Sequence, residues 1–231
     1  MERFGGSRGA SPAVAGPPRL PFADRRAAGR DLAGRLGRWA DEGDLVVLGL
    51  PRGGVPVAGE VARLLNAPLD VFVVRKLGVP GHEELALGAV ASGGVRVLND
   101  EVVATFGVSD ADLALLTERA RREVAAREVA YREDAPALPP SGRAAVLVDD
   151  GLATGASMRA AIAALRTARP RLIVVAVPVA PPEVCRSLRG DADGVVCAAT
   201  PDPFSAVGLW YHDFRPVTAD EVREVLRRSR R

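Results

Sequence analysis

Residues 145–157 decide the fold. They read Ala145-Val146-Leu147-Val148-Asp149-Asp150-Gly151-Leu152-Ala153-Thr154-Gly155-Ala156-Ser157. The first four are uninterrupted apolar residues, a pattern typical of a strand buried on both faces of a parallel sheet. Two carboxylates follow, then a short segment of small and hydroxyl-bearing residues, and then a helical pattern over residues 157–168. This order predicts a binding site, because ligands of open α/β sheets bind outside the carboxyl ends of the strands.

The small residues and hydroxyls of this segment suit a phosphate group. Small residues let backbone N–H groups approach an anion, and a helix N-terminus adds unpaired N–H donors and a favourable dipole. Thr154 and Ser157 add hydroxyl donors. Asp149 and Asp150 would repel a bare phosphate, but they suit sugar hydroxyls, which donate hydrogen bonds, or a water-bridged divalent cation. The combination predicts a phosphorylated ribose as ligand, with the carboxylates on its 2′- and 3′-hydroxyls.

Apolar strand patterns and helical patterns alternate along the rest of the chain. The strand patterns cover residues 45–50, 69–74, 144–148, 172–177 and 194–197, and a hairpin is predicted from residues 85–90 and 95–98. The helical patterns cover residues 24–40, 58–65, 109–131, 157–168, 182–188 and 218–228. The alternation predicts an α/β fold, an open parallel sheet of about five strands with helices on both faces.

We expect a single domain over residues 22–231, preceded by a flexible tail at residues 1–21 that is rich in Gly, Ala and Pro. Within the domain, residues 109–132 are expected as a helical insertion and residues 201–231 as a small C-terminal hood and helix. No run of about 18 uncharged apolar residues is present, so we expect no membrane-spanning helix.

The acidic stretch resembles the phosphoribosyl-pyrophosphate motif of the type I phosphoribosyltransferases, which is an apolar strand, two acidic residues, a small linker and a Thr-Gly loop. The stretch departs from the motif at Ala156 and Ser157, where Gly or Lys and Thr are common, but both residues are small enough to keep the loop. Ala153 stands where some purine enzymes of the family have an aspartate that accepts a proton from the base. The resemblance therefore assigns no such role to position 153.

A second segment resembles the same family. Residues 48–56 look like its pyrophosphate loop, in which the turn Arg52-Gly53-Gly54 exposes backbone amides and offers a guanidinium for bidentate contact with phosphate oxygens. Arg75-Lys76 resembles the basic position that contacts the diphosphate, and Val79–Val90 resembles the flexible loop that closes over the reacting centre. From Phe22 to Leu226 the chain is similar to a bacterial group of predicted phosphoribosyltransferases whose acceptor is not assigned.

The resemblance implies an enzyme that transfers a 5-phosphoribosyl group between phosphoribosyl diphosphate and a nitrogenous base through an oxocarbenium-like transition state. It implies catalytic roles for Arg52, Lys76, Asp149 and Asp150. It implies donor binding by Arg52, Gly53, Gly54, Arg75, Lys76, Asp149, Asp150, Gly151, Leu152, Ala153, Thr154, Gly155, Ala156 and Ser157. It also implies Mg²⁺ held through the donor's diphosphate and ribose hydroxyls, with no direct protein ligand, and a homodimer.

The charge balance helps to weigh an alternative in which the protein is a regulator rather than an enzyme. The net charge is +2, from 31 basic and 29 acidic residues, which argues against a polyanion such as nucleic acid as main partner. The alternative is a regulatory protein that senses phosphoribosyl diphosphate, binds nucleic acid and has no catalysis. The arginine-rich helix around Arg119, Arg121, Arg122 and Arg127 is the feature in its favour. A third, weaker interpretation is a nucleoside hydrolase or kinase, although no P-loop sequence is present.

The two cysteines, Cys185 and Cys197, have neither metal-ligand spacing nor a histidine cluster nearby, so we expect buried, reduced thiols in a cytoplasmic protein. Seven other side chains keep two interpretations. The histidines and glutamates could assist the acceptor or the metal, or they are solvated groups. The aromatic rings could stack on a flat acceptor, or they pack the C-terminal segment. These residues are His82, Glu83, Glu84, Trp210, Tyr211, His212 and Phe214.

Overall fold

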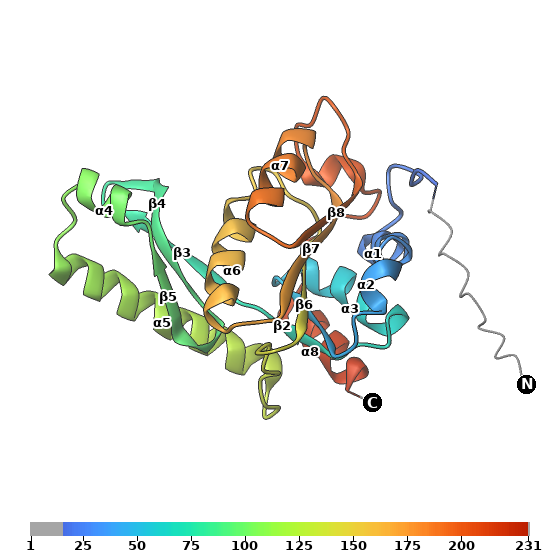
Figure 1. The fold of residues 1–231 in the computed structure, drawn as a ribbon, viewed down its shortest axis with the longest axis horizontal. Coiled ribbons are helices and arrows are strands. Elements are labelled where there is room, and N and C mark those ends of the chain that lie inside the picture. Colours follow the sequence, from blue (N-terminus) through green and yellow to red (C-terminus); the bar gives the residue numbers. More distant parts are fainter. Residues whose placement is uncertain (1–15, 231) are drawn as a thin grey trace, which may run out of the picture.

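The structure is a computed structural model that describes residues 16–230 (Figure 1). Its centre is a five-stranded parallel sheet in the order β2-β1-β6-β7-β8. The strands are β1 (Leu45–Gly49), β2 (Leu69–Val71), β6 (Ala144–Val148), β7 (Leu172–Val179) and β8 (Gly194–Ala199). The open parallel α/β sheet predicted from the apolar runs is thus confirmed.

Helices cover both faces of this sheet because the strands are apolar on both sides. Alternate residues of a strand point to opposite faces. Val146 packs in one core with α3 (Gly54–Leu64) and α8 (Ala219–Ser229), to which Leu32 of α1 (Arg25–Gly34) also belongs. Its neighbour Leu147 packs in the other core with α6 (Ala156–Thr167) and α7 (Pro182–Ser187). The two cores hold the carboxyl ends of the strands in fixed positions.

A second, antiparallel sheet forms an arm beside the first, in the green part of Figure 1. Its strands are β3 (Val74–Val79), β4 (His82–Ala91) and β5 (Val95–Leu98), and it is followed by α4 (Asp100–Thr105) and α5 (Asp110–Arg132). The pairing of β4 with β5 confirms the hairpin predicted from the sequence.

One prediction in this region is wrong. Residues 69–74 are not one strand, because the chain leaves the parallel sheet after Val71 and Val73 binds Ser92 of the arm through two hydrogen bonds of 2.8 Å. In residues 79–90, which were expected as a flexible loop, β3 and β4 pair and leave a tight turn at Pro80–Gly81. Their motion during a reaction stays a prediction.

The first helix is also shorter than predicted. Asp24 caps it as expected by accepting a hydrogen bond from the N–H of Ala27, but α1 ends at Gly34. A separate short helix, α2 (Gly37–Ala40), follows. Glycines flank the break at both sides, and glycine costs a helix about 1 kcal/mol relative to alanine.

A buried ion pair ties the arm to the parallel sheet. Asp70 of β2 accepts hydrogen bonds from Arg132 Nε of α5 at 2.8 and 3.0 Å. The same carboxylate accepts from the backbone N–H groups of Val71 and Leu138, at 2.8 and 3.0 Å. Arg132 also donates to Glu128, at 2.6 Å. The carboxylate is 1% exposed, so its charge is balanced inside the protein.

The described residues begin at residue 16, within the tail that the sequence predicts at residues 1–21. The first fifteen residues of the predicted tail, 1–15, lie outside the described part. Phe22, by contrast, is fixed by backbone hydrogen bonds with Trp210 and His212, both of 2.8 Å. Within residues 16–230, every helix is too short or too polar to cross a membrane. The division into a helical insertion and a hood stays a prediction.

Candidate active site

The acidic pair lies directly after β6, at the carboxyl end of the central strand. Asp149 Oδ1 accepts a hydrogen bond of 2.9 Å from the backbone N–H of Asp150. Burial raises the pKa of the Asp149 carboxyl well above its usual range, and the neighbouring Asp150 charge raises it further. Burial also raises the pKa of Asp150, while Arg25 opposes that change. The two carboxylates therefore form a partly desolvated acceptor pair.

The turn Arg52-Gly53-Gly54 packs against this pair. A Cβ atom on Gly53 would lie 2.0 Å from Asp150 Oδ2, and one on Gly54 would lie 2.8 Å from the Cα of Asp149. Both positions therefore require glycine for the turn to approach so closely. Arg52 is exposed, follows a cis peptide bond and has no ion-pair or hydrogen-bond partner for its side chain in the described part of the chain. Its guanidinium is free to contact an anion.

The segment after the acidic pair forms an open loop at the start of α6. Leu152 anchors it through a 3.0 Å hydrogen bond from its N–H to the carbonyl of Val179. Gly155 has φ +73°, the left-handed region that favours glycine, and precedes the helix. The backbone N–H groups of residues 153–155 and of Ser157 have no acceptor among residues 16–230. These amides are open to an anion, and their role as a phosphate cradle stays a prediction.

The structure does not bring Arg75 and Lys76 into contact with the acidic pair. Neighbouring residues of a strand point to opposite faces, and Arg75 Nε forms a 3.0 Å ion pair with Glu123 of α5. Lys76 is exposed and has no ion-pair partner within the described residues. Arg75 is thus committed to a contact inside the arm. The role of Lys76 stays a prediction.

Two residues that the sequence did not indicate hold Asp150. Arg25 Nε, at the start of α1, donates a 2.8 Å hydrogen bond to Asp150 Oδ2. The hydroxyl of Tyr211 donates to the carbonyl oxygen of Asp150, and burial raises the pKa of this tyrosine. Neither contact has a local signal, because the partners lie 125 and 61 residues apart in the sequence.

Comparison with known proteins then decides the family. The family model of the phosphoribosyl transferase domain matches residues 24–202, which contain the turn, the acidic pair and the loop. This chain belongs to the phosphoribosyl transferase domain family. The resemblance seen in the sequence is therefore confirmed, and so is the expected fold.

Relatives of this phosphoribosyl transferase domain come from two bacteria. Proteins of Mycobacterium tuberculosis strains CDC 1551 / Oshkosh and ATCC 25618 / H37Rv, each named "putative phosphoribosyl transferase", are 48% identical over 210 residues. The match covers 91% of this chain and 47% of theirs, so the chain spans about half the length of these curated relatives. The crystal structure of TT1426 from Thermus thermophilus is 47% identical, with a TM-score of 0.81, over 89% of this chain and 97% of that chain.

The aromatic residues of the phosphoribosyl transferase domain pack on one another. The rings of Tyr211 and Phe214 lie 5.0 Å apart, and those of Trp210 and Phe204 lie 6.1 Å apart. These contacts favour the packing interpretation over acceptor stacking. His82 stands against the ring of Phe106, 5.8 Å away, in the arm. Glu83 and His212 are exposed, and the side chain of Glu84 lies outside the described part.

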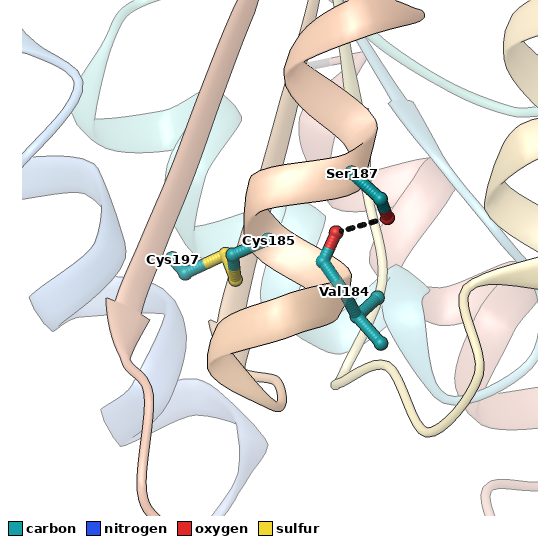
Figure 2. Close-up of a disulfide and its surroundings, with 4 residues drawn as sticks. All are labelled: Val184, Cys185, Ser187 and Cys197. Atoms are coloured by element: carbon teal, nitrogen blue, oxygen red, sulfur yellow. Dashed lines mark hydrogen bonds between the residues drawn. A yellow bond between two sulfur atoms is a disulfide. The ribbon is translucent and has the colours of Figure 1, made fainter.

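The prediction of two reduced thiols is wrong. Cys185 of α7 and Cys197 of β8 form a disulfide, with their Cα atoms 6.6 Å apart (Figure 2). The residues meet because the chain folds back between α7 and β8, a tertiary contact that cysteine spacing does not reveal. The neighbouring Val184 packs against the loop, since its Cγ1 would lie 2.9 Å from a Cβ on Gly155. The disulfide thus braces the helix that supports the phosphate cradle.

A hydrogen-bond chain connects the same helix to the loop. Ser187 Oγ donates to the carbonyl of Val184 at 2.9 Å, as Figure 2 shows, and accepts from Arg159 Nη2 at 2.8 Å. Arg159 Nη1 donates in turn to the carbonyl of Thr154, at 2.9 Å. The carbonyl of Thr154 is therefore paired within the protein, and the loop is tied to α7 through Arg159.

The donor set at this site fits magnesium that arrives with its substrate. Residues 16–230 contain no group of three or more His, Cys, Asp or Glu side chains that could hold a metal ion by themselves. Asp150 already shares its charge with Arg25. Magnesium would take its oxygen ligands from the donor's diphosphate and ribose hydroxyls.

Proposed function

We propose that the chain transfers a 5-phosphoribosyl group between phosphoribosyl diphosphate and a nitrogenous base, in a magnesium-dependent reaction. One observation carries the proposal: the glycines of residues 52–54 pack directly against Asp149 and Asp150, beside the open loop of residues 153–157. The turn that carries Arg52 thus contacts the two carboxylates, and the loop with its unpaired amides follows them directly in the chain. A donor that combines a diphosphate, two sugar hydroxyls and a phosphate offers a matching partner for each.

Each group has a separate part in the proposed complex. The ribose 2′- and 3′-hydroxyls donate to Asp149 and Asp150, and the 5′-phosphate accepts from the amides of residues 153–155 and Ser157 and from the hydroxyl of Thr154. The diphosphate accepts from Arg52, and Lys76 is proposed to reach it from β3. Magnesium, bound through the donor's diphosphate and hydroxyls, would supply further positive charge to the leaving group.

The chemistry requires positioning and charge stabilisation. The bond from C1 of the ribose to the diphosphate breaks, the electron pair leaves with the diphosphate, and a ring nitrogen of the base bonds to C1. Positive charge develops on the sugar in the transition state. In this proposal the negative charges of Asp149 and Asp150 stabilise it. Arg52 stabilises the negative charge that collects on the diphosphate.

Titration calorimetry with phosphoribosyl diphosphate, with and without Mg²⁺, tests the donor site. We expect magnesium-dependent binding that Asp150→Asn weakens by at least about tenfold, because a buried acceptor loses its charge. Arg26→Met, which changes an exposed arginine, serves as the control. Absence of binding in the unaltered chain contradicts the proposal. If binding occurs, a screen of purine and pyrimidine bases for diphosphate release identifies the acceptor.

Three of the four arginines that favoured the regulatory alternative have partners within the protein. Arg119 and Arg122 of α5 form ion pairs with Glu123 and Glu118, at 3.4 and 2.9 Å. Arg121 donates to the carbonyl of Gly94 at 3.3 Å. These arginines are engaged in a mixed-charge surface rather than gathered into a basic patch. The homodimer stays part of the proposal, and sedimentation of the full chain would measure it.

A further inference from the structure

The Arg25 side chain is held from three directions. Its Nε bonds Asp150 Oδ2 at 2.8 Å, and its Nη1 donates to the carbonyl of Arg215 at 2.9 Å. The guanidinium also lies over the ring of Phe214, with Cζ 4.0 Å from the ring centroid. The side chain is 10% exposed. A guanidinium with this many contacts is fixed in place before any ligand arrives.

The surroundings of Asp150 make this contact important. Asp149 precedes Asp150 at the same strand end, and the hydroxyl of Tyr211, from the C-terminal segment, donates to the backbone carbonyl of Asp150. The turn packed against it brings the backbone of Gly53 and no charge. Arg25 is therefore the cation in contact with Asp150 within residues 16–230.

We propose that Arg25 is a positioning residue of the donor site, which occupies Asp150 Oδ2 and so presents Oδ1 as the acceptor for a ribose hydroxyl. The guanidinium contacts Oδ2, which is also the oxygen nearest to the Gly53 turn, since a Cβ there would lie 2.0 Å from Oδ2 and 3.2 Å from Oδ1. This inference rests on the proposed function, because it names the residue that orients the acceptor. It assigns Arg25 no contact with the reacting atoms.

The charge of Arg25 has a second effect. Two adjacent carboxylates at a buried strand end repel each other, so without a cation one of them binds a proton more readily. A protonated carboxyl donates its own hydrogen bond and accepts a sugar hydroxyl less well. By opposing the rise in the pKa of Asp150, Arg25 keeps the Asp150 carboxylate available as an acceptor at lower pH.

The matched pair Arg25→Met and Arg26→Met tests the inference. Both substitutions remove one positive charge from adjacent positions and keep an unbranched apolar stem, but Arg26 is exposed and without a hydrogen-bond partner among residues 16–230. Affinity for phosphoribosyl diphosphate with Mg²⁺ is measured by calorimetry from about pH 5.5 to 8.5. Thermal unfolding confirms that each variant folds, and Arg25→Lys, which keeps the charge, replaces Arg25→Met if the latter does not fold.

We expect Arg25→Met to bind the donor about tenfold more weakly at the low end of this pH range and to approach the unaltered protein at the high end, because loss of the cation lets the pKa of Asp150 rise further. Arg26→Met should follow the unaltered protein at every pH. Arg25→Lys keeps the positive charge but loses the paired Nε and Nη1 contacts. Its donor affinity should therefore change with pH as in the unaltered protein, while remaining weaker at every pH. An Arg25→Met profile that runs parallel to the unaltered one overturns the inference.

A ligand-free measurement separates this inference from the proposed function. If the unaltered chain binds no donor, the proposed function fails. The inference is then decided by ¹³C NMR titration of the Asp150 carboxyl in the same proteins. A titration midpoint higher by about one unit in Arg25→Met supports the role of Arg25, and an unchanged midpoint overturns it.

Discussion

Gly53 lies so close to the Asp150 carboxylate that the position has no room for a side chain. Any side chain there would begin 2.0 Å from Asp150 Oδ2, well inside the contact distance of two atoms. The position therefore links the turn and the acidic pair sterically as well as chemically.

For Gly53→Ala we expect a folded protein whose donor binding is at least about tenfold weaker, an effect of about 1.4 kcal/mol. The added methyl group must move either the turn or the Asp150 carboxylate. The control is Gly34→Ala in α1, where a Cβ would meet nothing within 4 Å. Calorimetry and thermal unfolding of both variants check the prediction, and donor binding by Gly53→Ala at the unaltered affinity would contradict it.

Asp149 carries a charge that its surroundings disfavour. Because burial raises its folded-state pKa above the unfolded value, the folded chain binds more protons than the unfolded chain between those two values. The free energy of unfolding therefore falls as the pH rises through that range. The charge that suits a sugar hydroxyl is thus unfavourable for the stability of the empty protein.

For Asp149→Asn we expect greater stability at neutral pH, by about 1 kcal/mol or ~2–4 °C in Tm for a domain of this size, together with loss of donor binding. The asparagine carbonyl can still accept from the N–H of Asp150, so the local geometry is kept. Thermal unfolding between about pH 4 and 8 should show the gain growing as the pH rises. A lower Tm for the variant at neutral pH would refute this account.

At the scale of elements, a single buried carboxylate joins β2 to α5. Asp70 accepts from Arg132 and from two backbone N–H groups, and no water reaches it to replace a lost partner. Removing one member of a buried pair leaves the other charge uncompensated.

We expect Asp70→Ala to lower the free energy of unfolding by about 3–5 kcal/mol. Glu118→Ala, which breaks the exposed pair with Arg122 on the outer side of the same helix, should lower it by less than about 1 kcal/mol. Urea unfolding followed by circular dichroism measures both values. Equal effects would mean that the Asp70 network does not hold the arm in place.

The disulfide between α7 and β8 closes a loop with a sequence separation of 12 residues. Closing a loop of this size restricts the unfolded chain and is worth about 3 kcal/mol. We expect the double variant Cys185→Ser, Cys197→Ser to lose about that much, and dithiothreitol to lower the stability of the unaltered chain but not of the variant. An identical response of both to the reductant would contradict the prediction.

At the scale of the whole molecule, the two sheets differ in how they are protected. The strands β1 and β6 are buried at every residue, whereas β3 and β5 are partly exposed. Regions with few buried contacts open without global unfolding. We expect native-state hydrogen exchange to show β1, β6 and β7 opening only with the whole protein, and β5 opening at lower free energy. Uniform protection of both sheets would contradict this.

The sequence predicted what depends on contiguous residues. Uninterrupted apolar runs indicated buried parallel strands, and Asp149 and Asp150 stood next to the loop they serve. Contacts between distant segments had no such signal: Arg25 meets Asp150 across 125 residues, and Cys185 meets Cys197 only because α7 folds back. The arm was predicted in part, since the hairpin of residues 85–90 and 95–98 was expected. The close approach of Gly88 to β5, where a Cβ would lie 2.1 Å from the carbonyl of Val97, had no signal in the sequence.

The disulfide also affects the expectation about the subcellular location of the protein. Structural disulfides are rare in reducing compartments, so the cytoplasmic location expected from two separate thiols loses its basis. Fractionation followed by thiol counting of the isolated protein would answer this directly.

The same bond makes the protein convenient for site-specific labelling. The chain has two cysteines in all, and both are in the disulfide, so the oxidised protein has no reactive sulfhydryl. A cysteine introduced at Leu85, which is 45% exposed on β4, would be the single attachment point for a maleimide dye. Fluorescence from that dye would report whether the hairpin of β3 and β4 moves when a ligand enters.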